Sequence, residues 1–276
     1  MTTRRVALIH QAGSYCNPGV ARRLAKAGHD LVLHAPRPGM VEELEAMGAA
    51  LEVIGAEELP EPEWSSKPEG AALLIERALK RFGRIDAAAL LPPRGWYPGS
   101  IRGRLLDAPL DHIEAIGGYF EATAHMLRAV IPAVRDSGGG QILVYTSDSG
   151  ARPEAGWCLY GAARAGQNFL VQAVALEHAG DSICLNALGS KNAISAGFPG
   201  APPGSVKDNA VIPGDWSTHL VAETPLGRLG TMDELAAFAT VLLDGSSRFQ
   251  TAQYFSFSGG WNTSGASVAG PSDDER

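Results

Sequence analysis

Three residues near the middle of the chain have the types and the spacing of a proton-transfer site. Tyr160 and Arg164 are four residues apart in an amphipathic segment, so on a helix they lie on one face, a turn from each other. Ser147 ends a short apolar run thirteen residues before Tyr160. If that run is a strand beside the helix, a hydroxyl, a phenol and a guanidinium can converge on one substrate oxygen.

This combination suits general-base chemistry. A free tyrosine has a pKa of roughly 10, and a nearby positive charge lowers that value toward neutral pH. Arginine does not give up its proton, so Arg164 would tune and orient the phenol. We expect Tyr160 to take a proton from a substrate hydroxyl while Ser147 holds that oxygen by a hydrogen bond. Asp148, the next residue, is expected to be a solvated or capping loop carboxylate.

The elements that must position these residues follow from the hydrophobic pattern. Short apolar runs alternate with longer amphipathic ones, which is typical of a parallel sheet wrapped by helices. The expected strands are 6–9, 30–34, 51–54, 85–91, 141–146, 182–188 and 254–258. The expected helices are 18–27, 41–47, 69–82, 119–135, 159–178 and 232–244.

Local signals support several of these boundaries. Thr231 with Glu234 three residues on forms a capping box, and Gly28 and Gly83 follow helices as C-terminal stops. Loops are expected at 92–99 and 189–224, at the carboxyl ends of strands, where α/β sheets bind ligands. The second is long enough to be a substrate lid. We expect one domain over 1–265 and a polar tail over 266–276.

Composition excludes several classes of function. The chain has 276 residues, of which 45% are hydrophobic, with a net charge of −7 and no basic run. Nucleic acid and anionic membrane are therefore not expected partners. Three cysteines without metal-ligand spacing indicate neither disulfides nor a zinc site and fit a reducing cytoplasm. The apolar run at 6–9 is too short for a signal peptide or a membrane span.

A strand-end serine thirteen residues before Tyr-x-x-x-Lys is the signature of the short-chain dehydrogenases/reductases, and the chain resembles that superfamily over 6–261. The segments 224–230 and 259–261 share in the resemblance. It implies a Rossmann-like doubly wound parallel sheet in a single domain. Arg164 stands where the family has lysine, and this Ser–Tyr–Arg version resembles the halohydrin dehalogenases, which use the fold without a nicotinamide cofactor.

The turn after the first strand departs from the nucleotide-binding pattern. The family's three glycines fall at Gln11, Tyr15 and Asn17, while Gly13 and Gly19 are out of frame. A glycine-rich turn lets backbone and pyrophosphate meet at a helix N-terminus, and a phenol at Tyr15 would occupy phosphate space.

Four other family features are also missing. The second strand is followed by Arg37 and no carboxylate, and Tyr119 takes roughly the position of the family's active-site asparagine. Residues 90–93 replace the family's Asn-Asn-Ala-Gly, and residues 186–191 replace its Pro-Gly. We therefore expect no cofactor. An alternative is that Arg37 binds the 2′-phosphate of NADP. An exposed, solvated arginine at this position would give the same sequence pattern.

The resemblance also implies a pocket for a leaving anion in the vacated nucleotide space. In halohydrin dehalogenases an aromatic residue of the first turn lines a halide pocket, and Tyr15 matches it by position. The opposite wall would be Ser190, Lys191, Asn192 and Phe198, which offer donors and an apolar side. A solvated Lys191 on a surface loop is an equally open interpretation.

Three functions are consistent with these features. The first is a cofactor-independent lyase that closes vicinal haloalcohols to epoxides with release of halide, or opens epoxides with an anion. The second is an NADP-dependent oxidoreductase with an atypical cofactor loop, and the third is a binding member of the fold without catalysis. A small-molecule substrate is expected, and the superfamily's usual helix contacts, here 119–135 and 159–178, predict a homo-oligomer, a tetramer or a dimer.

Overall fold

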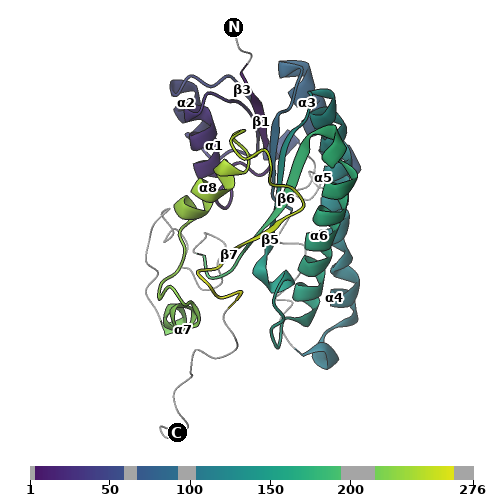
Figure 1. Ribbon diagram of the computed structural model, residues 1–276, viewed down its shortest axis with the longest axis vertical. Helices are drawn as coiled ribbons and strands as arrows, with labels where there is room; N and C mark the ends of the chain where they lie inside the picture. The colour runs from purple at the N-terminus through teal and green to yellow at the C-terminus, as the bar shows by residue number, and fades with distance from the viewer. Residues whose placement is uncertain (1–3, 59–66, 93–103, 194–214, 264–276) are drawn as a thin grey trace, which may run out of the picture.

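A parallel sheet forms the centre of the fold. The structure, a computed structural model, describes residues 4–58, 67–92, 104–193 and 215–263 (Figure 1). Its sheet has seven strands, all parallel, in the order β3-β2-β1-β4-β5-β6-β7. The strands are β1 (Val6–Ile9), β2 (Asp30–His34), β3 (Leu51–Ile54), β4 (Ala87–Leu90), β5 (Gly140–Ser147), β6 (Ile183–Ser190) and β7 (Tyr254–Phe257).

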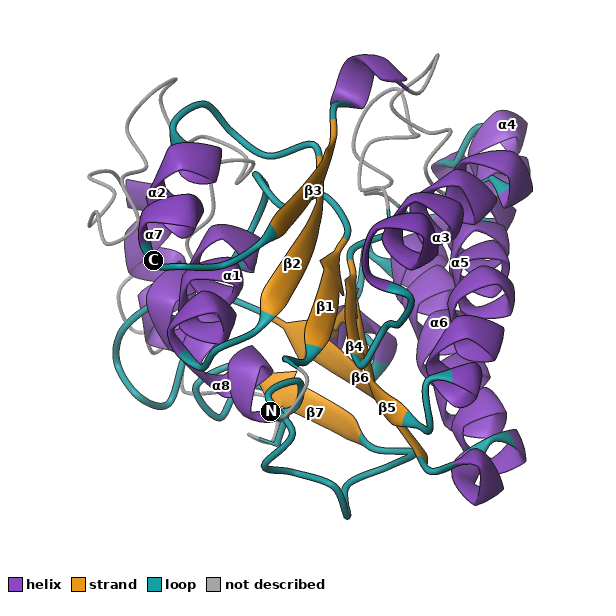
Figure 2. Cartoon of the chain, turned by 90° about the horizontal axis from the view of Figure 1, so that it is seen from above, coloured by secondary structure: helices purple, strands orange, loops and turns teal. Residues whose placement is uncertain are grey.

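Helices cover both faces of this sheet. One layer contains α3 (Pro68–Phe82), α5 (Gly117–Asp136) and α6 (Cys158–Glu177), with the short α4 (Leu110–Ala115) beside them, and the other contains α1 (Asn17–Lys26), α2 (Met40–Ala46), α7 (Asp215–Glu223) and α8 (Met232–Val241). Figure 2 shows the two layers on either side of the strands. Each layer buries its own hydrophobic cluster against the sheet, as expected for a single-domain doubly wound α/β fold.

The order of the strands places the candidate site. The chain winds outward from β1 to β3 on one side and from β4 to β7 on the other, so β1 and β4 meet at the centre (Figure 2). Ligands bind outside the carboxyl ends of the strands at such a reversal point. The turn after β1 and the ends of β5 and β6 all lie on this edge.

Most of the expected elements are confirmed, with ends shifted by a few residues. The capping box at Thr231 and Glu234 is present, and Gly28 and Gly83 adopt positive φ angles of 84° and 72° after their helices. Two helices were missed. α7 lies within the loop expected at 189–224, which is therefore wrong in part, and α4 is too short to show helical periodicity.

Some expectations fall outside the described residues. They include most of both loops, since 93–103 and 194–214 are not described, and the C-terminal tail. In the part of the chain that the structure covers, no helix is long and apolar enough to span a bilayer.

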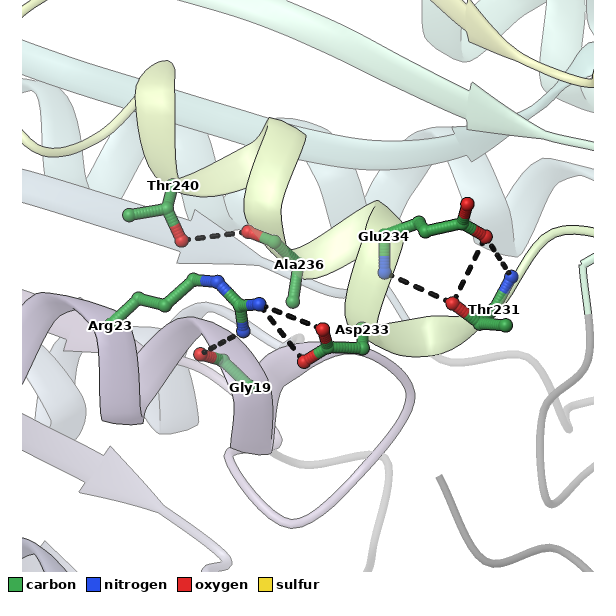
Figure 3. A network of polar contacts seen from close by, with 7 residues as sticks. All are labelled: Gly19, Arg23, Thr231, Asp233, Glu234, Ala236 and Thr240. Carbon is green, nitrogen blue, oxygen red and sulfur yellow. Dashed lines mark hydrogen bonds and ion pairs between the residues drawn. The ribbon is translucent and has the colours of Figure 1, made fainter. Parts of the chain in front are cut away.

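The contact between α1 and α8 explains one glycine of the first turn region. At Gly19 a Cβ atom would lie 2.7 Å from the Cβ of Ala236, so the two helices meet there without a side chain between them. Beside this contact Arg23 donates two hydrogen bonds of 2.9 Å to Asp233, as Figure 3 shows. Gly19 thus serves helix packing and not a phosphate cradle.

The outer faces of α5 and α6 carry apolar side chains. Phe169 and Leu176 on α6 are exposed, as is Phe120 on α5. Assembly through these helices would cover apolar surface of this kind, and the homo-oligomer stays a prediction.

Candidate active site

The turn after β5 is packed tightly on helix α6, and this sets the place of Ser147. The 3-10 turn Asp148–Gly150 follows Ser147 directly. A Cβ atom at Gly150 would lie 2.5 Å from the backbone carbonyl carbon of Arg164, and one at Gly161 would lie 2.8 Å from the carbonyl oxygen of Ser149. Two glycines therefore let the end of β5 approach the first turns of α6 at backbone distance.

A pair of glycine substitutions tests this packing. Because the added methyl of Gly150→Ala would meet backbone atoms that cannot rotate away, we expect it to lower the free energy of unfolding by about 1–3 kcal/mol. Gly166 lies within α6, and a methyl group added there meets open space. Gly166→Ala should therefore raise the free energy of unfolding by about 0.5–1 kcal/mol. Urea denaturation of both variants measures the difference, and equal stabilities would contradict this account of the turn.

Tyr160 lies in the first turn of α6 between two aromatic rings. The ring of Tyr119 meets it edge-on at a centroid distance of 6.0 Å, and the ring of Trp157 is tilted at 5.6 Å. Tyr119 comes from α5 and Trp157 from the segment that leads into α6. The neighbours fix the plane of the Tyr160 ring from two sides.

Arg164 is buried one turn further along α6, with 2% of its surface exposed. Its guanidinium carbon lies 4.2 Å from the centre of the Tyr119 ring and 5.1 Å from that of Tyr160, to which it is also hydrogen-bonded. Burial by itself lowers the pKa of Arg164, but the phenols of Tyr160 and Tyr119 raise it above its ordinary value. The charge is retained, and by reciprocity it favours ionisation of the phenol it touches.

Ser147 is the last residue of β5, buried and paired in register with Ser190 of β6. Its Oγ accepts a hydrogen bond of 3.3 Å from the backbone N–H of Ser149. That contact uses a lone pair, so the hydroxyl hydrogen can still be donated to a ligand oxygen.

Tyr15 extends across the same edge of the sheet from the turn after β1. Its backbone has a φ of 57°, and its hydroxyl is hydrogen-bonded to the Oγ of Ser190 at the end of β6. Since β4 and β5 lie between β1 and β6, the ring crosses the carboxyl ends of both, and it meets Tyr145 of β5 edge-on at 5.6 Å. Tyr15 and Ser190 are thus brought together, and the pocket expected between them stays a prediction.

Several N–H groups of the turn after β1 donate hydrogen bonds inside the protein. The N–H of Ala12 donates to the carbonyl of His34 at 2.6 Å, and that of Gly13 to the carbonyl of Ala35 at 3.0 Å. The side chain of Asn17 is fully buried and donates to the carbonyl of His10 at 2.8 Å. The turn is fastened to the end of β2, and Gly13 permits this close approach.

Two histidines pack under this turn. His10 and His34 stack with ring centroids 4.9 Å apart, and both are buried. The Nδ1 of His34 accepts a hydrogen bond from the backbone N–H of Gln11, which requires the neutral ring. Burial lowers the pKa of His34 to about 4, and burial together with His34 lowers that of His10 well below its ordinary value.

This pair predicts acid-sensitive stability. The pKa of His34 is 6.5 in the unfolded chain and about 4 in the folded protein. Between these pH values His34 is protonated in the unfolded chain but neutral in the folded protein. Since one pKa unit corresponds to about 1.4 kcal/mol, stability should fall by about 3 kcal/mol over this range from His34 alone, and His10 adds to the fall. Urea denaturation at pH 7.5 and 4.5 measures it. His34→Gln should weaken the pH dependence, and an unchanged dependence in that variant would contradict the assignment.

The side chains of Lys191 and Asn192 interact with other groups of the protein. The Nζ of Lys191 lies 2.6 Å from a carboxylate oxygen of Glu154 and over the rings of Trp157 and Trp261, at 5.2 and 4.6 Å. Its ammonium is therefore mostly buried and ion-paired, and Glu154 uses one of its three N–H donors. Asn192 is buried and donates to the hydroxyl of Thr224 at 3.0 Å, which ties the end of β6 to the end of α7.

Phe198, the fifth residue of the expected pocket, lies outside the described residues.

Asp148 requires a correction. It is fully buried and accepts a hydrogen bond from the hydroxyl of Tyr254 on β7, so the expected solvated or capping carboxylate is wrong. Burial raises the pKa of Asp148, and the bond from Tyr254 opposes that rise. The residue anchors the turn after Ser147 to β7.

Two further residues of the site were missed from sequence. Gln167 receives a hydrogen bond from Arg164, and Thr123 on α5 receives one from Gln167. Gln167 follows Arg164 by three positions, so helical spacing could have shown that the two share a face. Nothing in the sequence pairs Thr123 with α6, because that contact depends on how the two helices pack.

Comparison with known proteins places this geometry in a family. The sequence profile described as enoyl-(acyl carrier protein) reductase matches residues 18–262. The chain belongs to the short-chain dehydrogenase/reductase superfamily. Ser147 and Tyr160 stand at that superfamily's serine and tyrosine positions, with Arg164 at the position of its lysine.

Individual members show the range of activities in the superfamily. An uncharacterized oxidoreductase, Rv0769 of Mycobacterium tuberculosis, is 30% identical over 71% of this chain and 73% of its own length. The 2,5-dichloro-2,5-cyclohexadiene-1,4-diol dehydrogenase LinX of Sphingobium indicum is 24% identical over 94% and 96%. A solved structure described as a dehalogenation enzyme is 27% identical, covers 94% of this chain and 98% of its own, and superposes with a TM-score of 0.73.

The superfamily implies a nicotinamide nucleotide, and the turn after β1 tests whether one fits. A dinucleotide needs free backbone N–H groups and an open approach at the start of α1. Here the N–H groups of Ala12 and Gly13 are bonded to β2, and the Tyr15 ring crosses the edge of the sheet to Ser190. The residues of this turn do not fit a pyrophosphate in the superfamily's usual position.

Proposed function

We propose that the chain is a cofactor-independent lyase of the halohydrin dehalogenase type, which converts vicinal haloalcohols to epoxides and releases halide. The observation that carries the proposal is the contact of Tyr15 with Ser190 across the nucleotide path, combined with a buried arginine against Tyr160. The first supports a site without a nicotinamide nucleotide, and the second supports ionisation of Tyr160 as the base. Proton chemistry needs only the base.

The reaction follows from the roles of the three residues. Ionised Tyr160 takes the proton of the substrate hydroxyl, and Ser147 donates a hydrogen bond to the same oxygen. The oxygen's electron pair then attacks the neighbouring carbon, and the carbon–halogen bond breaks with its electron pair leaving on the halide. The proton on Tyr160 passes to solvent, so haloalcohol yields epoxide, halide and a proton. Arg164 stabilises the phenolate throughout.

The leaving anion requires donors opposite Tyr160. We infer that the hydroxyl pair of Tyr15 and Ser190 supplies one, since the hydrogen that their mutual bond does not use can turn toward an anion beside the pair. Lys191 is engaged by Glu154 and Asn192 by Thr224, so they would support the pocket wall without contacting the anion. The 27% identity to a dehalogenation enzyme over 94% of the chain supports this function.

The second candidate is an NADP-dependent oxidoreductase that acts on a hydroxyl or carbonyl substrate. It is favoured by the relatives Rv0769 and LinX, which are named an oxidoreductase and a dehydrogenase. In that function Tyr160 would exchange the same proton while hydride moves to or from the nucleotide, and Arg37 would meet the 2′-phosphate. It requires the turn after β1 to open.

Nucleotide titration separates the two candidates. The protein is titrated with NADH and NADPH by calorimetry, beside a nicotinamide-dependent member of the superfamily as a positive control. We expect no binding at micromolar nucleotide. Binding in that range would contradict the proposed function and favour the oxidoreductase.

A further inference from the structure

The guanidinium of Arg164 is held by neutral groups alone among the described residues. Its contacts there are the amide of Gln167, the ring face of Tyr119 and the phenol of Tyr160. No carboxylate of the described chain pairs with it. A buried cation without a counter-ion is costly, and ionisation of an adjacent phenol removes much of that cost.

Gln167 fixes the direction of this guanidinium. Its Oε1 accepts a hydrogen bond of 2.7 Å from the Nη1 of Arg164. Its Nε2 donates to the Oγ1 of Thr123 at 2.7 Å and to the carbonyl of Tyr119 at 3.0 Å. The two acceptors around Nε2 determine which way the amide faces, because a flipped amide would place two donors against each other toward Arg164.

The hydrogen-bond network continues from Gln167 to the backbone of helix α5. The hydroxyl of Thr123 donates to the carbonyl of Tyr119 one turn earlier in α5, at 2.9 Å. Gln167 is fully buried and Thr123 is 1% exposed, so water does not compete for these groups. The direction of the Arg164 side chain is thereby set by helix α5.

We propose that Gln167 is a positioning residue that holds the Arg164 guanidinium against the Tyr160 hydroxyl and leaves the charge uncompensated. The inference rests on the proposed function in one respect, that Tyr160 is the base. An amide is the side chain that does both tasks, since it accepts a hydrogen bond from the guanidinium without neutralising it. A carboxylate of the same length would pair with Arg164 and withdraw its charge from the phenol.

Other ionisable groups also face this pair. Tyr119 packs on Arg164 from α5, and Tyr15 interacts with it from the turn after β1. Lys191, which is paired with Glu154, lies over the ring of Trp157, and Asp148 lies in the turn packed on α6. Of these described residues Gln167 bonds to Tyr119 alone, through the backbone carbonyl and not the phenol, so a shift in the titration of Tyr160 would report mainly the Arg164 contact.

The test is a spectroscopic titration of the Tyr160 phenol. Phenolate absorbance is followed against pH, and the curve of the Tyr160→Phe protein is subtracted to isolate this one tyrosine. We expect Gln167→Glu to raise the apparent pKa of Tyr160 by at least one unit relative to the wild type. Gln167→Met, which removes the tether without adding charge, should raise it by less. Gln172→Glu, the same change on the same helix but with its amide bonded to Ala252, is the control and should not shift it.

The outcomes are distinguishable from those of the proposed function, because the titration needs no substrate. An unchanged Tyr160 titration in a folded Gln167→Glu protein would overturn the inference. If that variant does not fold, an unchanged titration in Gln167→Met would do so. A shift in Tyr160 without halide release would support the positioning role of Gln167 and contradict the lyase.

Discussion

Replacing Tyr160 by phenylalanine is expected to lower the rate of halide release from a vicinal haloalcohol by about 10²–10⁴-fold. The variant removes one oxygen atom, the proposed proton acceptor, and leaves the ring between Tyr119 and Trp157 in place. The wild-type rate should rise with pH along a single titration whose apparent pKa lies well below about 10, the free-phenol value. That rise should be absent in the variant.

Stability serves as the control for this comparison. Because the Tyr160 hydroxyl is hydrogen-bonded to buried Arg164, we expect the phenylalanine variant to fold but to unfold at a somewhat lower denaturant concentration than the wild type. A folded variant that releases halide at the wild-type rate would show that Tyr160 is not the base.

Replacing Arg164 by lysine is the second large effect, with an expected loss of about 10²-fold in kcat/KM, as for removal of one oriented charged donor. Lysine keeps the charge but lacks the planar fork. It therefore cannot bond to Gln167, stack on Tyr119 and face Tyr160 at once, as the guanidinium does.

The measurement is the pH dependence of turnover for Arg164→Lys beside Arg128→Lys, the same change at an exposed position of α5. Only the first should be impaired, with its titration displaced toward higher pH. Since lysine is the residue of nicotinamide-dependent members, a lysine variant with nearly full activity would favour the oxidoreductase.

The hydrophobic pattern predicts the fold well because the central strands are buried on both faces and each major helix packs an apolar face on the sheet. Every strand was expected within three residues of its observed ends. Helix α4 was not expected, since it has six residues and too few turns to display a period. Helix α7 was missed within a segment rich in proline and glycine, which resembles a loop.

The sequence predicts only part of the candidate site. Spacing was enough to bring Tyr160 and Arg164 onto one face of α6 and to set Ser147 at the end of β5. The surroundings depend on packing between distant segments, which spacing does not encode. Lys191 was expected as an anion donor, yet a carboxylate 37 positions earlier occupies it, and Asp148 is buried by a tyrosine 106 positions later.

The central claim is that this fold carries out proton chemistry without a nicotinamide nucleotide. The most direct test is to incubate the purified protein with a vicinal bromoalcohol in nucleotide-free buffer and to quantify bromide and epoxide together. We predict equimolar release of both by the wild type, and release at the buffer rate by the Tyr160→Phe protein. Failure of the wild type to release bromide, with NADPH-dependent reduction of a carbonyl substrate by the same preparation, would contradict the account.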